Sequence, residues 1–306
     1  MSRTILVSGA TGKQGKGVVD ALLSSPAKQP SFKVFALTRN TESPAAKALA
    51  DKYGSNLTLV GGDLDDCDAV FKAANTPIWG VFSVQVFSGG KASIESEGRQ
   101  GKALADAAIK HGVKHFVYTS ADRGGEERSE WDPTPIPHFA SKHWIEKHLI
   151  EKAAAANGSM SWTILRPSAF MENLQPGMMT KGMITGLDVT RSADQPIWWI
   201  ATKDIGLFAA DAFRDPEQWK NKSISLAADS LNLKQMDELF QQKTGKKAPR
   251  TFGLLVSAML WFTTDLRIML HWLAENPYEV DIPRLRKMHP EMQTLSQWLD
   301  ENWIGK

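Results

Sequence analysis

The 306-residue sequence has little of several features that would direct its interpretation elsewhere. It contains one cysteine, Cys67, which excludes intramolecular disulfides and cysteine-based zinc clusters and favours a reducing, intracellular compartment. Its 36 basic and 34 acidic residues leave a formal charge of +2, which argues against a protein that binds nucleic acid by neutralising phosphates. We therefore expect a cytoplasmic protein with no direct nucleic-acid partner.

Long uninterrupted hydrophobic runs are also missing. The first apolar run, Thr4–Val7, is too short for the core of a secretory signal peptide. The most apolar later stretch, Phe252–Leu273, contains Asp265, Arg267 and His271, whereas a membrane span needs about 20 residues almost free of charge. We interpret this stretch as amphipathic helices that pack on the rest of the protein, and we expect no membrane partner.

What is present is an alternation of short apolar runs with amphipathic stretches in the first half of the chain. Strands are expected at 5–8, 33–38, 57–61, 78–84, 115–120 and 162–166, and helices at 14–24, 44–53, 67–74, 97–111 and 138–157. This alternation predicts an α/β fold of the Rossmann type, a doubly wound parallel sheet with helices on both faces. Later helices are expected at 203–214, 233–244, 252–275 and 290–302, with a strand at 223–227.

The sharpest signal is the segment Gly9-Ala10-Thr11-Gly12-Lys13-Gln14-Gly15, which lies between the first expected strand and the first expected helix. Gly9 permits a tight turn, Gly12 lets the backbone approach a pyrophosphate, and Gly15 lets the helix pack against the strand. The start of a helix also offers N–H groups and a positive dipole to phosphate oxygens. A glycine triplet alone is weak evidence, but this context on both sides predicts a dinucleotide-binding site.

No acidic residue stands at the end of the second expected strand, where one would bind the ribose 2′-hydroxyl of NAD. The segment Thr38-Arg39-Asn40 offers instead the guanidinium of Arg39, which suits a 2′-phosphate and favours NADP(H). The alternative for Arg39 is an exposed loop arginine. Asp63 follows the third expected strand, where the adenine would lie, and it could also cap the next helix; both roles can hold together.

These signals divide the chain into two predicted domains. Residues 1–167, joined again by about 200–230, form the NAD(P)-binding Rossmann domain. Residues 168–199 and 231–306 form a smaller, mainly helical domain for a substrate or a partner.

Together these motifs resemble the NmrA-like family of atypical short-chain dehydrogenase/reductases, over nearly the whole chain and in the manner of its fungal members. Further matching segments are His111–Ser120, Leu165-Arg166-Pro167, Phe170–Asn173 and Asp281–Leu299. The resemblance implies a Rossmann domain and a smaller domain that closes a cleft. The family includes reductases of quinones and aromatic compounds and also non-catalytic redox sensors that regulate transcription, so the resemblance alone does not decide activity.

The resemblance assigns residues to each part of the dinucleotide. Arg39 and Asn40 would hold the 2′-phosphate, and Lys142 would meet the nicotinamide ribose. The full set, from the pyrophosphate through the 2′-phosphate, adenine and ribose to the nicotinamide, is Gly9, Thr11, Gly12, Lys13, Gln14 and Gly15; Arg39 and Asn40; Asp63 and Leu64; Val84, Gln85 and Val86; Lys142; and Pro167, Phe170 and Asn173.

Candidate catalytic residues are fewer. Classical short-chain dehydrogenases use Tyr-x-x-x-Lys on one helix face, where the lysine lowers the pKa of the phenol that delivers a proton. The matching frame here runs from His138 to Lys142, and the three tyrosines fall elsewhere. His138 is either a proton donor or a helix-start residue after Pro137, and Lys142 either holds the ribose or faces solvent. Ser120 either binds a substrate carbonyl or satisfies the local backbone.

The second half is rich in methionine and tryptophan. Each such residue is a candidate for core packing, but as a group they suit a bulky, flat, poorly charged ligand; they are Met171, Met178, Met179, Met183, Trp198, Trp199, Trp261 and Trp272. No histidine or carboxylate cluster has metal-ligand spacing, so no metal is expected.

Three hypotheses about function follow. The first is an NADPH-dependent reductase of an aromatic, quinone-like or enone/ketone small molecule. The second is a non-catalytic NADP(H) sensor that docks on a regulatory protein, which leaves nuclear entry open. The third is non-redox chemistry, such as isomerisation or cyclisation, on the same scaffold. The oligomeric state has no signal in the sequence.

Overall fold

The computed structural model describes residues 2–24, 30–85, 91–276 and 278–303. The chain folds into two compact units: unit 1 consists of Met1–Ala121, Ser141–Arg166 and Thr202–Ile224, and unit 2 of Asp122–Ala140, Pro167–Ala201 and Ser225–Lys306. The domain limits drawn from the sequence remain a prediction. These units differ from it most in the segment Asp122–Ala140, which packs with unit 2.

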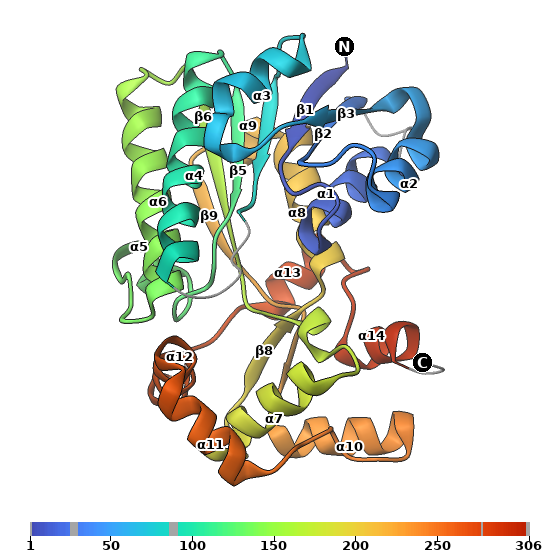
Figure 1. The fold of residues 1–306 in the computed structure, drawn as a ribbon, viewed down its shortest axis with the longest axis vertical. Coiled ribbons are helices and arrows are strands. Elements are labelled where there is room, and N and C mark those ends of the chain that lie inside the picture. Colours follow the sequence, from blue (N-terminus) through green and yellow to red (C-terminus); the bar gives the residue numbers. More distant parts are fainter. Residues whose placement is uncertain (1, 25–29, 86–90, 277, 304–306) are drawn as a thin grey trace. The chain divides into compact units, whose positions relative to one another are not determined.

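Unit 1 is built on a seven-stranded sheet (Figure 1). Its strands lie in the order β3-β2-β1-β4-β5-β6-β9, and β3, β2, β1, β4, β5 and β6 are mutually parallel. Their bounds are β1 (Arg3–Val7), β2 (Phe32–Thr38), β3 (Leu57–Gly61), β4 (Gly80–Ser83), β5 (His115–Thr119), β6 (Ser161–Pro167) and β9 (Lys222–Leu226). The order reverses between β1 and β4, and ligands of such sheets bind at the carboxyl ends of the strands at this point. The predicted Rossmann-type α/β fold is confirmed.

Helices cover both faces of this sheet (Figure 1). One face carries α3 (Cys67–Ala74), α4 (Lys91–Lys110) and α6 (Pro137–Ala155), which share one hydrophobic core with the strands. The other carries α1 (Lys13–Leu23), α2 (Pro44–Tyr53) and α8 (Thr202–Arg214). The short α9 (Pro216–Trp219) precedes β9.

Helices α1 and α8 touch backbone to backbone. A Cβ atom on Gly206 would lie 2.3 Å from the carbonyl oxygen of Gly17, and one on Gly17 would lie 2.8 Å from that of Thr202. Real Cβ atoms do not come this close to backbone, so both positions require glycine. A segment from late in the chain thereby completes the layer that begins with α1.

Unit 2 combines a small sheet with helices. Its sheet has the order β10-β8-β7, formed by β10 (Asp229–Leu231), β8 (Ile197–Ile200) and β7 (Ala169–Phe170). Its helices, besides the start of α6, are α5 (Glu126–Trp131), α7 (Met178–Thr190), α10 (Leu233–Thr244), α11 (Gly253–Phe262), α12 (Thr264–Glu275), α13 (Ile282–Met288) and α14 (Leu295–Asn302). The amphipathic helices expected within 252–275 are α11 and α12, and the helix expected at 290–302 begins only at Leu295.

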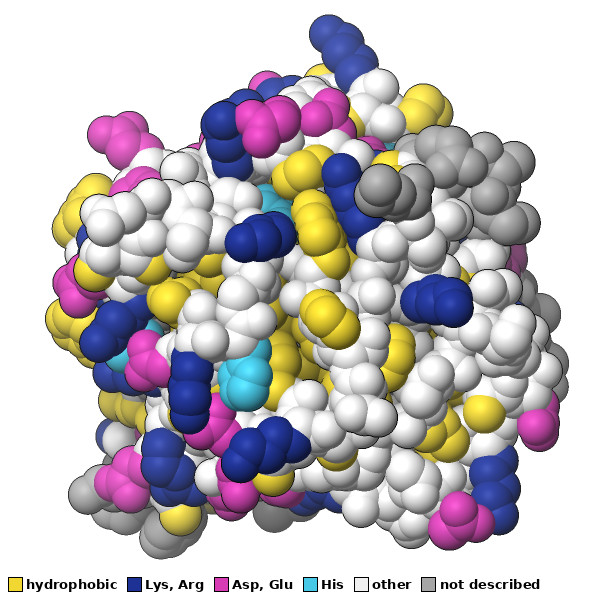
Figure 2. Space-filling view, turned by 90° about the horizontal axis from the view of Figure 1, so that it is seen from above, with side chains coloured by type: hydrophobic (Ala, Val, Ile, Leu, Met, Phe, Trp, Pro, Cys, Tyr) yellow, Lys and Arg dark blue, Asp and Glu magenta, His cyan; other side chains and the backbone are white. Residues whose placement is uncertain are grey.

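The face of unit 1 that points upward in Figure 1 carries Lys and Arg side chains interspersed with Asp, Glu and hydrophobic side chains (Figure 2).

None of the helices in the described ranges is long and apolar enough to cross a membrane.

Candidate functional site

The glycine-rich turn between β1 and α1 leaves no room for side chains. Gly9 has a φ of +57°, in the left-handed region, and its carbonyl oxygen accepts a hydrogen bond of 2.9 Å from the N–H of Gly12. A Cβ atom on Gly15 would lie 2.2 Å from that same oxygen. The turn is therefore as tight as the sequence predicts, because the first turn of the helix passes directly over Gly9.

Helix α1 begins without a cap. Its N-cap residue is Gly12, which has no side chain to accept a hydrogen bond, and its first turn contains no acidic residue. The first N–H groups of any helix have no acceptor within the helix, so an uncapped start with a positive dipole is suited to bind an anion.

Side chains from three strand ends support this turn. The Gln14 Oε1 atom accepts from the Thr119 hydroxyl at 2.6 Å, which ties the turn to the end of β5. The Ser8 hydroxyl donates to the carbonyl of Val84 at 2.9 Å and accepts from its N–H at 2.8 Å. Gln85 is buried and donates to the Ser83 hydroxyl at 2.8 Å. Unit 1 thus brings Gln14 and Val84 to the turn, whereas the predicted ribose contact Val86 lies outside the described residues.

Arg39 immediately follows β2 and is exposed. Its guanidinium makes no hydrogen bond or ion pair with any described residue, so it can bind a ligand without breaking a contact. The amide oxygen of Asn40 accepts from the N–H of Glu42 at 2.9 Å, which fixes the loop that carries Arg39.

Asp63 has the capping role that the sequence left open. Its carboxylate accepts from the N–H of Asp65 at 3.0 Å and so caps the short 3₁₀ helix Leu64–Asp66. Gln100 of α4 approaches the same oxygen at 3.4 Å. Leu64 packs against the core on the α3 and α4 face. A contact of Asp63 and Leu64 with adenine stays a prediction.

Lys142 lies on α6 and forms an ion pair that the sequence did not predict. Its Nζ atom is 2.8 Å from the Oε1 atom of Glu97 on α4, and the two side chains are 15% and 0% exposed. Ser120 is buried at the end of β5, and its N–H donates to the carbonyl of Leu165 at 2.7 Å. Lys142 and Ser120 both belong to unit 1, with the glycine turn and Arg39.

The remaining predicted site residues belong to unit 2. His138 lies in the first turn of α6, and its ring packs edge-on against Phe139 with 4.8 Å between centroids. Pro167 is buried at the end of β6, and Phe170 lies in β7. Asn173 is exposed in the 3₁₀ helix Met171–Leu174.

The methionines and tryptophans of unit 2 divide into two groups. Met171, Trp199 and Trp272 are buried, as core packing requires. Met178 and Met179 are 70% and 87% exposed at the start of α7, and Met183 and Trp198 are half-buried. The side chain of Trp261 lies outside the described residues. A ligand wall made of the whole group stays a prediction.

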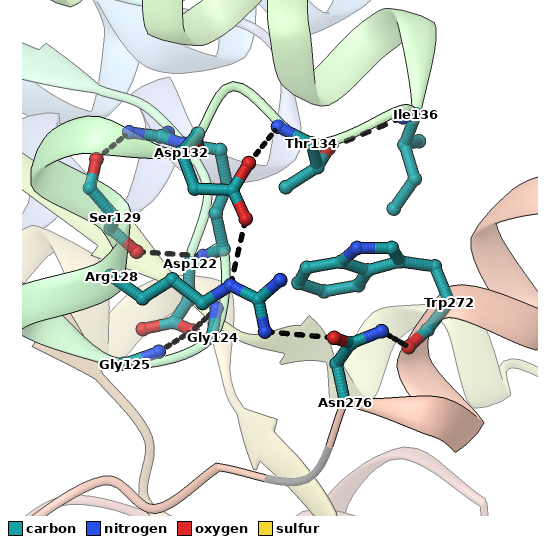
Figure 3. A network of polar contacts seen from close by, with 11 residues as sticks. Asp122, Gly124, Gly125, Arg128, Ser129, Asp132, Thr134, Ile136, Trp272 and Asn276 are labelled. Atoms are coloured by element: carbon teal, nitrogen blue, oxygen red, sulfur yellow. Dashed lines mark hydrogen bonds and ion pairs between the residues drawn. The ribbon is translucent and has the colours of Figure 1, made fainter.

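The segment after β5 is held by a polar network within unit 2 (Figure 3). Asp122 accepts from the N–H groups of Gly124 and Gly125 at 3.0 and 2.9 Å, and both glycines have φ in the left-handed region, at +100° and +89°. Burial raises the pKa of Asp122, while these hydrogen bonds and the Ser225 hydroxyl oppose the rise. The sequence did not point to this carboxylate as a site residue, although its place two residues before the Gly124-Gly125 pair could have indicated a turn.

Arg128 anchors the same segment to α12 (Figure 3). Its guanidinium donates to Asp132 at 2.7 Å and to Asn276 at 2.8 Å, and it lies 4.8 Å from the centre of the Trp272 ring. Burial also raises the pKa of Tyr278 well above its usual range, and the nearby Asp122 adds to the rise. A phenol in this environment holds its proton, unlike the tyrosine of a Tyr-x-x-x-Lys pair.

Among the described residues, no three His, Cys, Asp or Glu side chains come together as a metal ion would require.

The fold and the glycine-built turn define a Rossmann-type α/β protein, the class of fold that binds dinucleotides at the switch point of its sheet. The NmrA-like family matches residues 1–291. The chain belongs to this family, and the resemblance seen in its motifs is confirmed.

One protein of related sequence and two solved structures of similar fold illustrate the comparison. The NmrA-like family domain-containing oxidoreductase FrzB of Cladobotryum sp is 34% identical over 273 residues, which cover 81% of this chain and 75% of FrzB. The structure of NmrA, a negative transcriptional regulator, in complex with NADP has a TM-score of 0.72 at 18% identity, over 98% of this chain and 95% of NmrA. The NADPH complex of the quinone oxidoreductase QOR2 from Escherichia coli has a TM-score of 0.70 at 20% identity, over 97% and 99% of the two chains.

Proposed function

We propose that this protein is an NADPH-dependent reductase of an aromatic, quinone-like or enone/ketone small molecule. The observation that carries the proposal is the uncapped, glycine-built start of α1 in the same unit as the guanidinium of Arg39, which has no partner among the described residues. The first would bind a pyrophosphate and the second a 2′-phosphate, and NADP(H), unlike NAD(H), carries both.

The residues present fit this cofactor. The backbone from Gly12 to Gly15 would hold the pyrophosphate, because a side chain at Gly15 would collide with Gly9 and the helix start has no carboxylate of its own. Arg39 and Asn40 would hold the 2′-phosphate. Lys142 would donate to the nicotinamide ribose. When bound, NADPH supplies the hydride, and the protein supplies orientation and a water-poor site.

Support for the substrate class comes from composition and from relatives. Methionine and aromatic side chains of unit 2 suit a flat, apolar ligand. FrzB is named an oxidoreductase, and QOR2 is an NADPH-dependent quinone oxidoreductase. His138 and Ser120 are the candidates to give or position a proton, since each carries an exchangeable proton at neutral pH.

A substrate panel tests the proposal. The protein is incubated with NADPH and a series of quinones, aryl ketones and enones, and the loss of NADPH absorbance is followed. We expect turnover of at least one class, and none by an Arg39→Asp variant at a limiting NADPH concentration. No turnover of any compound, with NADPH shown to bind by titration, would contradict a reductase and favour the second candidate.

The second candidate is a sensor that binds NADP(H) without turnover and docks on a regulatory protein. One observation favours it: the frame of the catalytic tyrosine holds His138, and its lysine is paired with a buried carboxylate. The solved relative NmrA is a transcriptional regulator. Affinity capture with the protein loaded with NADP⁺ or NADPH should then recover a partner whose amount changes with the redox state of the cofactor. Equal recovery in both states would count against a sensor.

A further inference from the structure

The partner of Lys142 is an unusual one. Glu97 is completely buried, and the ammonium of Lys142 is the only hydrogen-bond partner of its carboxylate among the described residues. Its second oxygen, Oε2, is buried and accepts no hydrogen bond within the same residues. A buried carboxylate satisfied on one side alone is costly, and removal of its single partner leaves an uncompensated charge.

The packing of α4 against α6 places this carboxylate. A Cβ atom on Gly101 of α4 would lie 2.6 Å from the Cδ1 atom of Ile145 on α6, so the helices approach closely only because the residue is glycine. The Ser141 hydroxyl of α6 donates to the carbonyl of Ile94 on α4 at 3.3 Å. Glu97 and Lys142 therefore meet at a seam with little freedom to separate.

The charged side chains of α4 and α6 near this seam form ion pairs with other residues. The neighbouring ion pairs are Arg99 with Asp65, Glu146 with Arg166, and His148 with Asp106. The other titratable side chains of unit 1 next to this seam are His143, which follows Lys142 on α6 and is buried, and Tyr118 on β5, which packs in the same core as Ile145. Within the part of the chain that the structure describes, neither Lys142 nor Glu97 takes part in another ion pair, so each neutralises the other.

We propose that Glu97 is the positioning residue of Lys142: it holds and neutralises the ammonium, so that Lys142 acts as a hydrogen-bond donor to the bound dinucleotide. This inference rests on the proposed function. An ammonium has three N–H donors, and Glu97 occupies one, which leaves donors for a ribose hydroxyl. A neutralised lysine also has less power to drive a proton from a nearby acid. This matters because His138 precedes Lys142 by four residues on α6. An unpaired lysine ammonium there would favour the deprotonated form of the imidazole.

The variants that test this are Glu97→Gln, Lys142→Met and the double variant. Glu146→Gln is the matched control, because it breaks the other buried ion pair of α6, that with Arg166. For each protein the affinity for NADPH is titrated between about pH 7 and pH 9, and the protons taken up on binding are measured by calorimetry in two buffers of different ionisation enthalpy. Thermal unfolding reports stability separately.

In Glu97→Gln the ammonium lacks its counter-ion, so burial favours the neutral amine as the pH rises. We expect its NADPH affinity to fall by about tenfold across this range, with proton uptake on binding, while the wild type and Glu146→Gln stay flat. Lys142→Met and the double variant should bind equally weakly, without pH dependence. Should Glu97→Gln fail to fold, Glu97→Asp, whose carboxylate is one methylene short, should show the same profile in weaker form.

A flat profile without proton uptake in the Glu97 variant would overturn the inference and leave the proposed function standing. Additive losses in the double variant would do the same, since residues that act as a pair are not additive. A wild type that fails to bind any dinucleotide would overturn both.

Discussion

Helices begin in two ways in this protein. In unit 2, α10 starts with a capping box, in which the Asn232 side chain accepts from the N–H of Gln235 and the Gln235 side chain accepts from the N–H of Asn232. Helix α14 repeats the arrangement with Thr294 and Gln297. In unit 1, α1 starts at Gly12 and has neither a cap nor an acidic residue in its first turn. A good cap contributes about 1 kcal/mol of stability, so α1 lacks a stabilising contribution that α10 and α14 have.

An open start alone does not mark a ligand site, because α7 also begins after an uncapped glycine, Gly177, with no acidic residue in its first turn. At α1 the open start coincides with the tight glycine turn that follows β1. Helices whose first N–H groups are satisfied by their own side chains have no use for an external anion. The start of α1 is kept open by glycines whose positions are fixed by contact with backbone. Variants that close this start, or that open the capped ones, should separate binding from stability.

The largest effect is expected from Gly15→Ala. The new methyl group would lie 2.2 Å from the Gly9 carbonyl oxygen, and the backbone there has no way to retreat. We expect a loss of about 1–3 kcal/mol of stability or more, as for an overpacked core, and loss of measurable NADPH binding. Denaturant unfolding and a cofactor titration measure the two. The control is Gly182→Ala in α7, where no atom lies within 4 Å, and it should be neutral or stabilise by up to about 1 kcal/mol.

Gly12→Asp converts the start of α1 into a capped one. The carboxylate would accept from the first-turn N–H groups and complement the dipole, so the melting temperature should be unchanged or higher. NADPH affinity should fall by on the order of a hundredfold, since the carboxylate occupies the donors and repels the pyrophosphate. Gly12→Ala isolates the steric part, because a Cβ atom there lies 3.2 Å from the Gly9 oxygen. Equal losses in both variants would mean that space, and not open N–H groups, governs binding.

Arg39→Ala tests the cofactor preference of the same unit. NADPH should bind about ten- to a hundredfold more weakly, the cost of one charge-assisted contact to phosphate, while NADH should scarcely change. Arg39→Asp should go further by repelling the 2′-phosphate and offering an acceptor to a 2′-hydroxyl. Titration of both cofactors against the three proteins decides the matter. Equal losses for NADH and NADPH would show that Arg39 supports the fold.

Acid should act on the two units with opposite signs. Burial lowers the pKa of His115, on β5 of unit 1, to about 3. The unfolded chain binds a proton at this site below about pH 6.5 and the folded chain does not, so stability falls by about 2 kcal/mol between about pH 7 and pH 5. His115→Gln should flatten this fall. Asp122 in unit 2 has a raised pKa and gains its proton more readily when folded, so its protonation opposes the fall as the pH approaches the ordinary carboxyl range, and Asp122→Asn should make the fall steeper there. Urea unfolding from about pH 7 to about pH 4 measures both.

The smallest effect is expected at the capped helices. Asn232→Ala and Thr294→Ala should each cost about 1 kcal/mol of stability by removing a cap. Neither should alter NADPH affinity, which matched titrations would verify. A cap variant that weakened binding as much as Gly12→Asp would contradict the division of roles between the two kinds of helix start.

Much of unit 1 was predictable because its signals are local. The glycine turn consists of seven consecutive residues, Gly9–Gly15. The strands around it are apolar runs that the sheet buries on both faces. Arg39 follows a strand as expected, and its contact with a 2′-phosphate stays a prediction. Glu97 was not, because it lies 45 residues before Lys142 and meets it only through the packing of two helices. Position in the three-dimensional fold, and not any nearby pattern, gives Glu97 its importance.

Unit 2 was harder to predict for the same reason. Arg128 and Asn276 are 148 residues apart, yet their contact helps to place the segment after β5 in unit 2. The long apolar stretch predicted helices but not the boundary between α11 and α12, because no proline or glycine marks it at Thr263. Strands β7, β8 and β10 are too short for alternation to be visible.

The contact of Gly17 with Gly206 also constrains how the protein is made. Helix α1 leaves the ribosome before α8, the helix that packs against its Gly17 face, which is encoded almost two hundred residues later. While those residues are made, at about 5–20 per second, the nascent chain carries that face uncovered. We therefore expect a fragment that ends before α8 to aggregate rather than to form a small working domain.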